Sequence, residues 1–244
     1  MPTLPTNRDA SSSTADHVSD HNALHALYTA MNGTPPTFTT PPHPDDIPAS
    51  PNAADYEFNG SGSSLPTGWS WVNQGTSTYA EANGYGSLDF QAGGADESRG
   101  IVRAVPAGAS WTATFHAPAA LRVASGTTPS RALILRSSGD NRFTFFTQLT
   151  DQTAVVDHYT SVTAFSSRPG AAVTVFQAPM MPYVRVVKNS ATSWDFAISP
   201  NGTTWVTTHA GINVGTFHTP DQIGIGVNTR TNRLHLGVNW FRVS

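Results

Sequence analysis

The sequence contains no cysteine and little charge, and each absence narrows its chemistry. Without cysteine, no disulfide bond can staple the fold and no thiolate can act as a nucleophile. Charged residues make up 12% of the chain, which is about half of the roughly 25% that is typical of globular domains. Lys188 is the single lysine, and the net charge is −3. A nucleic-acid interface needs a clustered basic face, so this composition does not support one.

Long apolar runs are also absent. No run reaches the roughly 18 apolar residues that a membrane-spanning helix needs, and Met1–Thr6 carries neither the basic nor the apolar part of a secretion signal. We therefore expect no membrane span and no conventional signal peptide.

Glutamate is scarce, and this bears on catalysis. Glu57, Glu81 and Glu97 are the only three, and none stands two or four residues from another acid on a predicted strand. Asp96 and Glu97 are adjacent, which places them on opposite faces of a predicted turn. Retaining glycoside hydrolysis needs two carboxylates about 5–5.5 Å apart on one face. We therefore expect no catalytic pair and no enzymatic activity.

The amino-terminal region differs in charge from the rest of the chain. Residues 1–58 hold one base and seven acids, whereas residues 59–244 hold twelve bases and nine acids. An acidic arm suits a basic docking surface, but acidic composition is also common in solvated linkers. Both interpretations stay open.

A short helix is predicted at residues 19–32. Ser19 is a favourable N-cap, Asp20 suits the positive end of the helix dipole, and Asn32-Gly33 is a stop signal. A helix of about 18 Å is marginally stable alone, so its apolar stripe needs a partner or other copies of the chain. The predicted attachment and oligomerisation residues are Ala23, Leu24, Leu27, Tyr28 and Met31.

No metal or cofactor is expected. His17, His21 and His25 recur every four residues, a spacing that metal-binding imidazoles can use, but a polar solvated face explains them more simply. Asp140-Asn141 and Asn201 are isolated and do not form the oxygen cluster that calcium requires.

A proline-rich linker is predicted at residues 34–54. Seven prolines between residues 34 and 51 favour an extended, semi-rigid backbone. The chain therefore divides into an attachment segment at 1–33, this linker, and a domain at 55–244.

From Tyr56 onward, apolar and polar residues alternate over short runs that end at Gly, Asn, Pro or Ser. About a dozen such runs at intervals of roughly 8–12 residues predict an all-β sandwich or barrel. Ser137–Asp140 and Pro200–Gly202 are predicted hairpin turns. The predicted strands are Ser77–Ala82, Gly86–Phe90, Ser98–Ala104, Trp111–His116, Arg131–Arg136, Arg142–Leu149, Ala154–Tyr159, Ala172–Gln177, Tyr183–Asn189, Ser193–Ser199, Thr203–His209, Gln222–Asn228 and Leu234–Val243.

Three stretches of the domain, Asp55–Asn73, Tyr183–Thr208 and Ile223–Val243, resemble the concanavalin-like (laminin-G-like) jelly-roll modules. The resemblance covers residues 55–244 and implies an antiparallel jelly-roll sandwich, preceded here by the short helix and the proline-rich neck. In such modules a final strand like Trp240–Val243 pairs beside the first strand and closes the sandwich. This resemblance predicts the fold but not the function, because the same fold occurs in lectins, glycosidases, lyases and adhesion modules.

Sugar sites commonly stack a ring on an aromatic side chain and bind hydroxyls with polar groups. The tyrosines among our candidates flank a Gly-rich loop and are expected to be exposed, and the Arg and Gln candidates share one face of a predicted strand. Tryptophan, however, fills a sandwich core more often than it binds a ligand. The candidate glycan-binding residues are Trp69, Tyr79, Tyr85, Arg142 and Gln148.

Residues 16–27, DHVSDHNALHAL, resemble the short segment that opens many tailed-bacteriophage virion proteins, with His21–Leu24 at its centre. The resemblance implies a structural protein that is trimeric or bound to the capsid or tail, and that is assembled in the host cytoplasm without a signal peptide. We interpret the chain as a minor tail or tail-fibre protein that docks to other virion proteins through residues 1–51 and contacts host-surface glycan through its β-sandwich. The alternatives are a capsid-decorating head fibre, a decoration without a ligand, and a carbohydrate-binding module of a polysaccharide-processing enzyme.

Overall fold

The predicted helix, the linker and the five attachment residues lie outside the residues that the structure describes. Within the described residues, no helix is long and apolar enough to cross a membrane. The computed structural model describes residues 55–82, 85–91, 97–122, 130–149, 153–175, 181–228 and 233–244.

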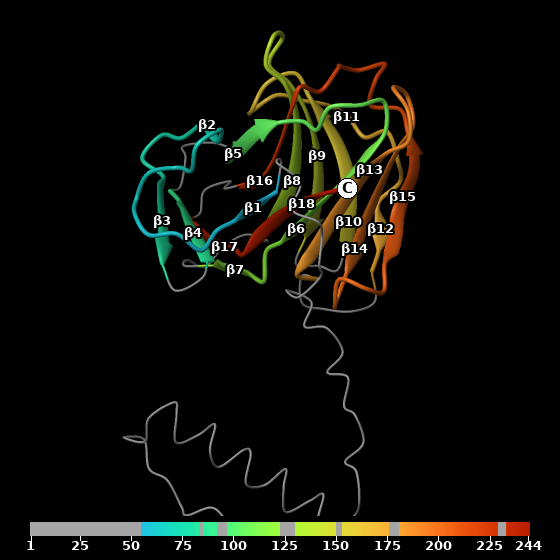
Figure 1. Cartoon of the computed structure of the whole chain (residues 1–244). Coiled ribbons are helices and arrows are strands. Elements are labelled where there is room, and N and C mark those ends of the chain that lie inside the picture. Colours follow the sequence, from blue (N-terminus) through green and yellow to red (C-terminus); the bar gives the residue numbers. More distant parts are fainter. Residues whose placement is uncertain are drawn as a thin grey trace, which may run out of the picture. The chain divides into compact units, whose positions relative to one another are not determined.

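Short strands make up the secondary structure of the described residues (Figure 1). In chain order they are β1 (Tyr56–Glu57), β2 (Ser70–Val72), β3 (Thr78–Ala82), β4 (Tyr85–Phe90), β5 (Ser98–Ala104), β6 (Trp111–His116), β7 (Ala119–Arg122), β8 (Ser130–Ser137), β9 (Arg142–Leu149), β10 (Thr153–Tyr159), β11 (Phe165–Ser167), β12 (Val173–Thr174), β13 (Tyr183–Lys188), β14 (Trp194–Ser199), β15 (Val206–Ile212), β16 (Gln222–Asn228), β17 (Leu234–Val238) and β18 (Trp240–Val243).

The strands form two large antiparallel sheets and one small one. The six-stranded sheet has the order β1-β18-β6-β13-β14-β15, and the eight-stranded sheet has the order β11-β10-β9-β8-β16-β5-β2, with β12 beside β10. The four-stranded sheet has the order β3-β4-β17-β7 and lies at one side of the sandwich (Figure 1). The final strand pairs with the first, since Tyr56 lies opposite Phe241. The predicted antiparallel sandwich and its closing strand pair are therefore confirmed.

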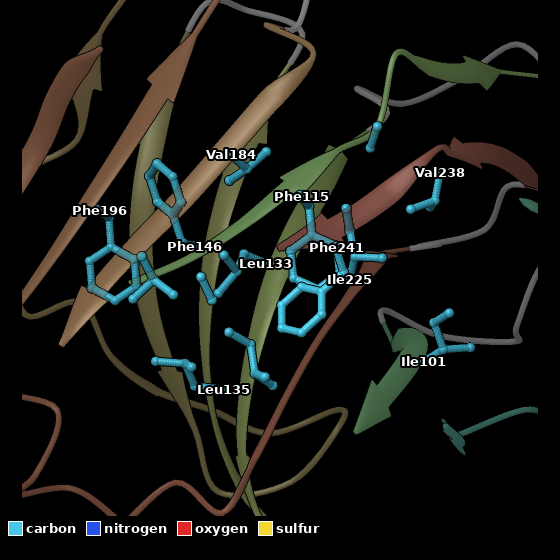
Figure 2. Packing of buried hydrophobic residues seen from close by; sticks show 14 of the residues in the cluster. Ile101, Phe115, Leu133, Leu135, Phe146, Val184, Phe196, Ile225, Val238 and Phe241 are labelled. Carbon is cyan, nitrogen blue, oxygen red and sulfur yellow. The ribbon is translucent and has the colours of Figure 1, made fainter. Parts of the chain in front are cut away.

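The main core lies between the two large sheets and follows from the two-residue period of the strands. Phe115 of β6 and Phe241 of β18 come from the six-stranded sheet, whereas Leu133 and Leu135 of β8 and Phe146 of β9 come from the eight-stranded sheet (Figure 2). All five are fully buried. Each buried side chain of this size stabilises the fold by about 1.5–3 kcal/mol relative to exposure.

The eight-stranded sheet is buried on both faces, so β8 is buried at six successive positions instead of alternating. A second cluster that includes Ile134 and Phe145 covers its outer face. A Cβ atom at Gly226 of β16 would clash with the backbone carbonyl oxygen of Arg99 on β5 and would lie 2.9 Å from Cδ1 of Ile134 in this cluster. Glycine at this position is therefore a packing requirement.

Both predicted hairpin turns are confirmed, because they join the antiparallel pairs β8–β9 and β14–β15. The strand after the second turn begins at Val206 and not at Thr203. The reason is that the side-chain oxygen of Asn201 accepts hydrogen bonds from the amides of Thr203 and Thr204, at 3.0 and 2.8 Å, which extends the turn.

Other boundaries also differ from the prediction. The predicted strand Leu234–Val243 divides at Asn239, whose amide donates to the carbonyl oxygen of His116 as the chain passes from one sheet to another. The predicted strand Ala172–Gln177 is observed only as Val173–Thr174 among the described residues. The prediction missed the short strands β1, β2, β7 and β11.

Candidate functional site: a hollow where two sheets meet

A surface hollow of about 450 Å³ lies where two neighbouring strands leave the six-stranded sheet together. At Pro118 the chain passes from β6 to β7, and at Asn239 it passes from β17 to β18. Strand β6 pairs with β18 and β7 pairs with β17, so both bends fall at the same corner of the fold. The residues that line the hollow are Tyr85, Ser87, Pro118, His235, Leu236, Gly237 and Asn239.

The alternation of β4 turns the Tyr85 side chain toward the hollow. Gly86 and Leu88 are buried, so Tyr85 and Ser87 share the opposite, outward side of the strand. A Cβ atom at Gly86 would lie 2.9 Å from the Phe58 ring, so the inner side of β4 is closely packed at this point. Tyr85 is 45% exposed although it stands on a well-packed strand. A rigid element therefore presents an open aromatic ring at the edge of the hollow.

Neutral polar groups surround this ring. The side chains of Ser87 and Asn239 form no hydrogen bond with any described residue, so their donors and acceptors are available to a ligand. Gly237 lies opposite Ser87 in the β4–β17 pair. Because glycine has no side chain, the hollow is bounded at this point by the backbone of Gly237. None of the lining residues is Asp, Glu, Lys or Arg. The hollow therefore suits an uncharged, hydroxyl-bearing ligand better than an ion.

An ordered ion pair stands beside the hollow on the same side of the sheet. Nε of Arg233 donates to Oδ1 of Asp89 at 2.8 Å, and Nη2 donates to Oδ2. Asp89 lies opposite His235 in the strand pair, and Nε2 of His235 is 3.6 Å from Oδ1 of Asp89. The hydrogen bond from Arg233 is the main cause that lowers the pKa of the Asp89 carboxyl. Asp89 is thus an ionised acceptor held in a fixed position next to His235.

Only one of the five candidate glycan-binding residues lies at this hollow, and that residue is Tyr85. Tyr79 is 3% exposed and donates its hydroxyl hydrogen to Glu81, so the prediction that Tyr79 is exposed is wrong. Tyr79 and Glu81 occupy the buried positions of β3, which turns both into the interior. Trp69 is 7% exposed and packs edge-on against Phe241 in the core, as is usual for tryptophan in a sandwich.

Arg142 and Gln148 share one side of β9, but that side faces the interior. Gln148 is 5% exposed, and its side-chain oxygen accepts a hydrogen bond from Arg131. Arg142 donates through Nη1 to the carbonyl oxygen of Phe217 at 2.7 Å, and its guanidinium lies over the Phe217 ring. Neither residue lines the hollow beside Tyr85.

Sequence reasoning missed the other lining residues, although the period of β4 pointed to Ser87. The alternation in YGSLDF places Ser87 on the same side as Tyr85. His235 and Asn239 reach the hollow through the pairing of β17 with β4 and the bend after β17, which are long-range features. A single sequence does not reveal such a register.

The three glutamates lie in separate environments. Glu81 accepts from the hydroxyls of Tyr56 and Tyr79, and Glu57 is paired with Arg242. Glu97 accepts from Asn73 and is paired with Arg99. The hydrogen bond from Asn73, followed by that from Arg99, lowers the pKa of the Glu97 carboxyl. Each carboxylate is thus tied to its own set of neighbours.

No protein-family model and no curated protein matches this sequence. Among solved structures, the chain is similar to a protein of unknown function from Saccharomyces cerevisiae, with 13% identity, a TM-score of 0.49, and coverage of 73% of this chain and 96% of that one. It is also similar to winged bean acidic lectin in complex with methyl-α-D-galactose, with 12% identity, a TM-score of 0.48, and coverage of 78% and 97%.

An engineered GH43 glycoside hydrolase is similar over 77% of this chain, with 16% identity and a TM-score of 0.48, but the match spans only 40% of the hydrolase. At these values the likeness carries no inference about a ligand or a reaction. The class of the chain is defined by its own topology, which is the predicted concanavalin-like, antiparallel jelly-roll sandwich.

Proposed function

We propose that this β-sandwich is a carbohydrate-binding domain that holds a neutral saccharide in the hollow beside Tyr85. The observation that supports this proposal is an open tyrosine ring on a rigid strand, next to the uncommitted side chains of Ser87 and Asn239. The C–H face of a sugar packs on an aromatic ring, while its hydroxyls both donate and accept hydrogen bonds. A hollow of about 450 Å³ falls within the roughly 300–1,000 Å³ that is usual for small-ligand sites.

A glycan array probed with the full chain tests the binding function. We expect retention of the wild-type chain on at least one neutral glycan and loss of that signal in Tyr85→Ala. Phe165→Ala is the matched control, because Phe165 is a similarly exposed aromatic residue (55%) on β11, away from the hollow. Equal loss in both variants, or retention in Tyr85→Ala, would contradict the assignment of the site.

We further propose that residues 1–51 attach this domain to a bacteriophage particle, at the tail tip or tail fibre, or alternatively as a head fibre. Support comes from the resemblance of residues 16–27 to the opening segment of virion proteins and from the apolar stripe of the predicted helix. The double substitution Leu24→Asp and Leu27→Asp should abolish incorporation into particles, because burying unpaired carboxylates costs several kcal/mol. Normal incorporation of a folded double mutant would count against attachment through this stripe.

We propose binding without catalysis. The lining residues of the hollow include no carboxylate, whereas retaining hydrolysis needs two. Incubation of the chain with the polysaccharide that it binds should release no reducing ends above a buffer blank. If the wild type releases reducing ends and Asp89→Asn does not, the chain is instead a polysaccharide-processing enzyme.

A further inference from the structure

We infer that the site accepts a linear oligosaccharide and not only a single sugar, with a second subsite at Asp89, Arg233 and His235. This inference rests on the proposed function of the hollow and extends it along the strands. The second subsite would take a neutral sugar unit with neighbouring hydroxyls.

The first observation is that the outward positions of β4 form a straight row. Tyr85, Ser87 and Asp89 alternate with buried residues, so all three project from the same side of the strand. At about 3.4 Å per residue, the row from Tyr85 to Asp89 extends over about 14 Å. This row is longer than one sugar ring, so the ring of Tyr85 and the carboxylate of Asp89 serve different units of a chain.

The second observation is that no side chain of β17 stands between the two ends of the row. On β17, Gly237 lies opposite Ser87 and His235 lies opposite Asp89. The glycine removes the only side chain that would stand between the two ends on this strand. His235 both lines the hollow and contacts Asp89, so it joins the first subsite to the second.

The third observation is the chemistry of the ion pair. Arg233 uses Nε and Nη2 to hold Asp89, while its Nη1 makes no hydrogen bond with a described residue and its side chain is 46% exposed. The Asp89 side chain is 15% exposed and both of its oxygens accept from Arg233, so the acceptor that it offers a ligand is the remaining lone pairs of this carboxylate, next to the Nη1 donor of Arg233. Two neighbouring hydroxyls of a sugar match that pattern, because each hydroxyl both donates and accepts. The pair is electrically balanced, which favours a neutral sugar over an acidic one.

Titration calorimetry with the full chain tests the second subsite. The probes are glucose, galactose, mannose and N-acetylglucosamine, each compared with its own di- and trisaccharide homologues. For the sugar that binds, we expect the trisaccharide to bind at least about tenfold more tightly than the monosaccharide. In Arg233→Gln we expect this ratio to fall below about threefold. Lys188→Gln is the control for loss of a surface charge away from the hollow. Its ratio of trisaccharide affinity to monosaccharide affinity should match that of the wild type.

The possible outcomes separate the two proposals. Equal affinity for mono- and trisaccharide in the wild type would overturn the second subsite and leave the hollow intact. A tenfold ratio that survives in Arg233→Gln would also overturn it, provided that the melting temperature shows a folded variant. Absence of binding to every probe and to the glycan array would overturn the proposed function itself.

Discussion

The buried histidine His218 predicts a specific loss of stability in acid. Oγ1 of Thr144 lies 2.9 Å from Nδ1 of His158 and 2.9 Å from Nε2 of His218. The hydroxyl has one hydrogen, so it donates to one imidazole and accepts from the other. His218 is 5% exposed, and its Nδ1 has no hydrogen-bond partner among the described residues. Among the described residues no carboxylate is in direct contact with the His218 ring, so a proton on this ring would have no counter-ion beside it.

Burial is the main cause that lowers the pKa of His218, to about 4 from its ordinary value of 6.5. His158 and Arg142 lower this pKa further, whereas Asp140 and Asp221 raise it. Because the folded-state pKa lies below the unfolded one, the unfolded chain binds the proton first. Stability is therefore fully present above about pH 6.5 and falls as the pH drops toward 4. The loss reaches about 2 kcal/mol at pH 5 and about 3 kcal/mol at pH 4.

His218→Gln isolates this effect, since the glutamine amide can still donate to Thr144 but does not titrate. Urea unfolding of the full chain and of the variant at several pH values between 7 and 4 gives the two free energies of unfolding. We expect the variant to be less stable at pH 7 and the gap to close by about 2 kcal/mol by pH 5. His158 and His209 also have lowered pKa values, so both proteins lose stability in acid and only the difference is diagnostic. Parallel curves would refute the assigned burial of a neutral His218.

Two further predictions concern the packing of the sandwich. Arg131 is 1% exposed and donates to the carbonyl oxygens of Ala117 and Met181 and to the side chain of Gln148. Because Arg131→Ala leaves these buried acceptors unpaired, it should lower the free energy of unfolding, measured in urea, by about 3 kcal/mol or more. A cost below about 1 kcal/mol would show that water replaces the guanidinium. Gly224→Ala places a Cβ atom against the carbonyl oxygen of Ile101 and should lower the melting temperature by several degrees, whereas Gly139→Ala meets nothing within 4 Å and should change it little. Equal melting temperatures for the two glycine variants would contradict the close approach of β16 and β5.

Several strands of the core were predictable because their apolar residues repeat every two positions. Trp111–His116 and Gln222–Asn228 alternate clearly, and the structure has them with the predicted bounds. The short strands β1, β2, β7 and β11 carry too few residues to show a period, and β1 is recognisable only through its pairing with β18. The division of Leu234–Val243 at Asn239 could not be predicted from the sequence. Apolar and other residues alternate across Asn239, although the backbone passes there from one sheet to another.

The candidate site was predictable only in part. Tyr79 and Tyr85 look alike in the sequence, yet the first falls on the buried side of β3 and the second on the outward side of β4. The register of each strand sets which side its tyrosine takes, and a shift of one residue in a strand would turn that tyrosine to the other side. His235 and Asn239 join Tyr85 from a segment about 150 residues further along the chain, through strand pairing that no local pattern encodes.

The most direct test of the carbohydrate-binding hollow is an NMR titration of the isotope-labelled full chain with the saccharide that the array selects. We predict that the largest amide shifts cluster at Tyr85, Ser87, Gly237 and Asn239, which surround the hollow. The amides of Phe165–Ser167 on β11 should not move. Shifts that cluster away from β4 and β17, or the absence of any shift at saturating saccharide, would contradict the account.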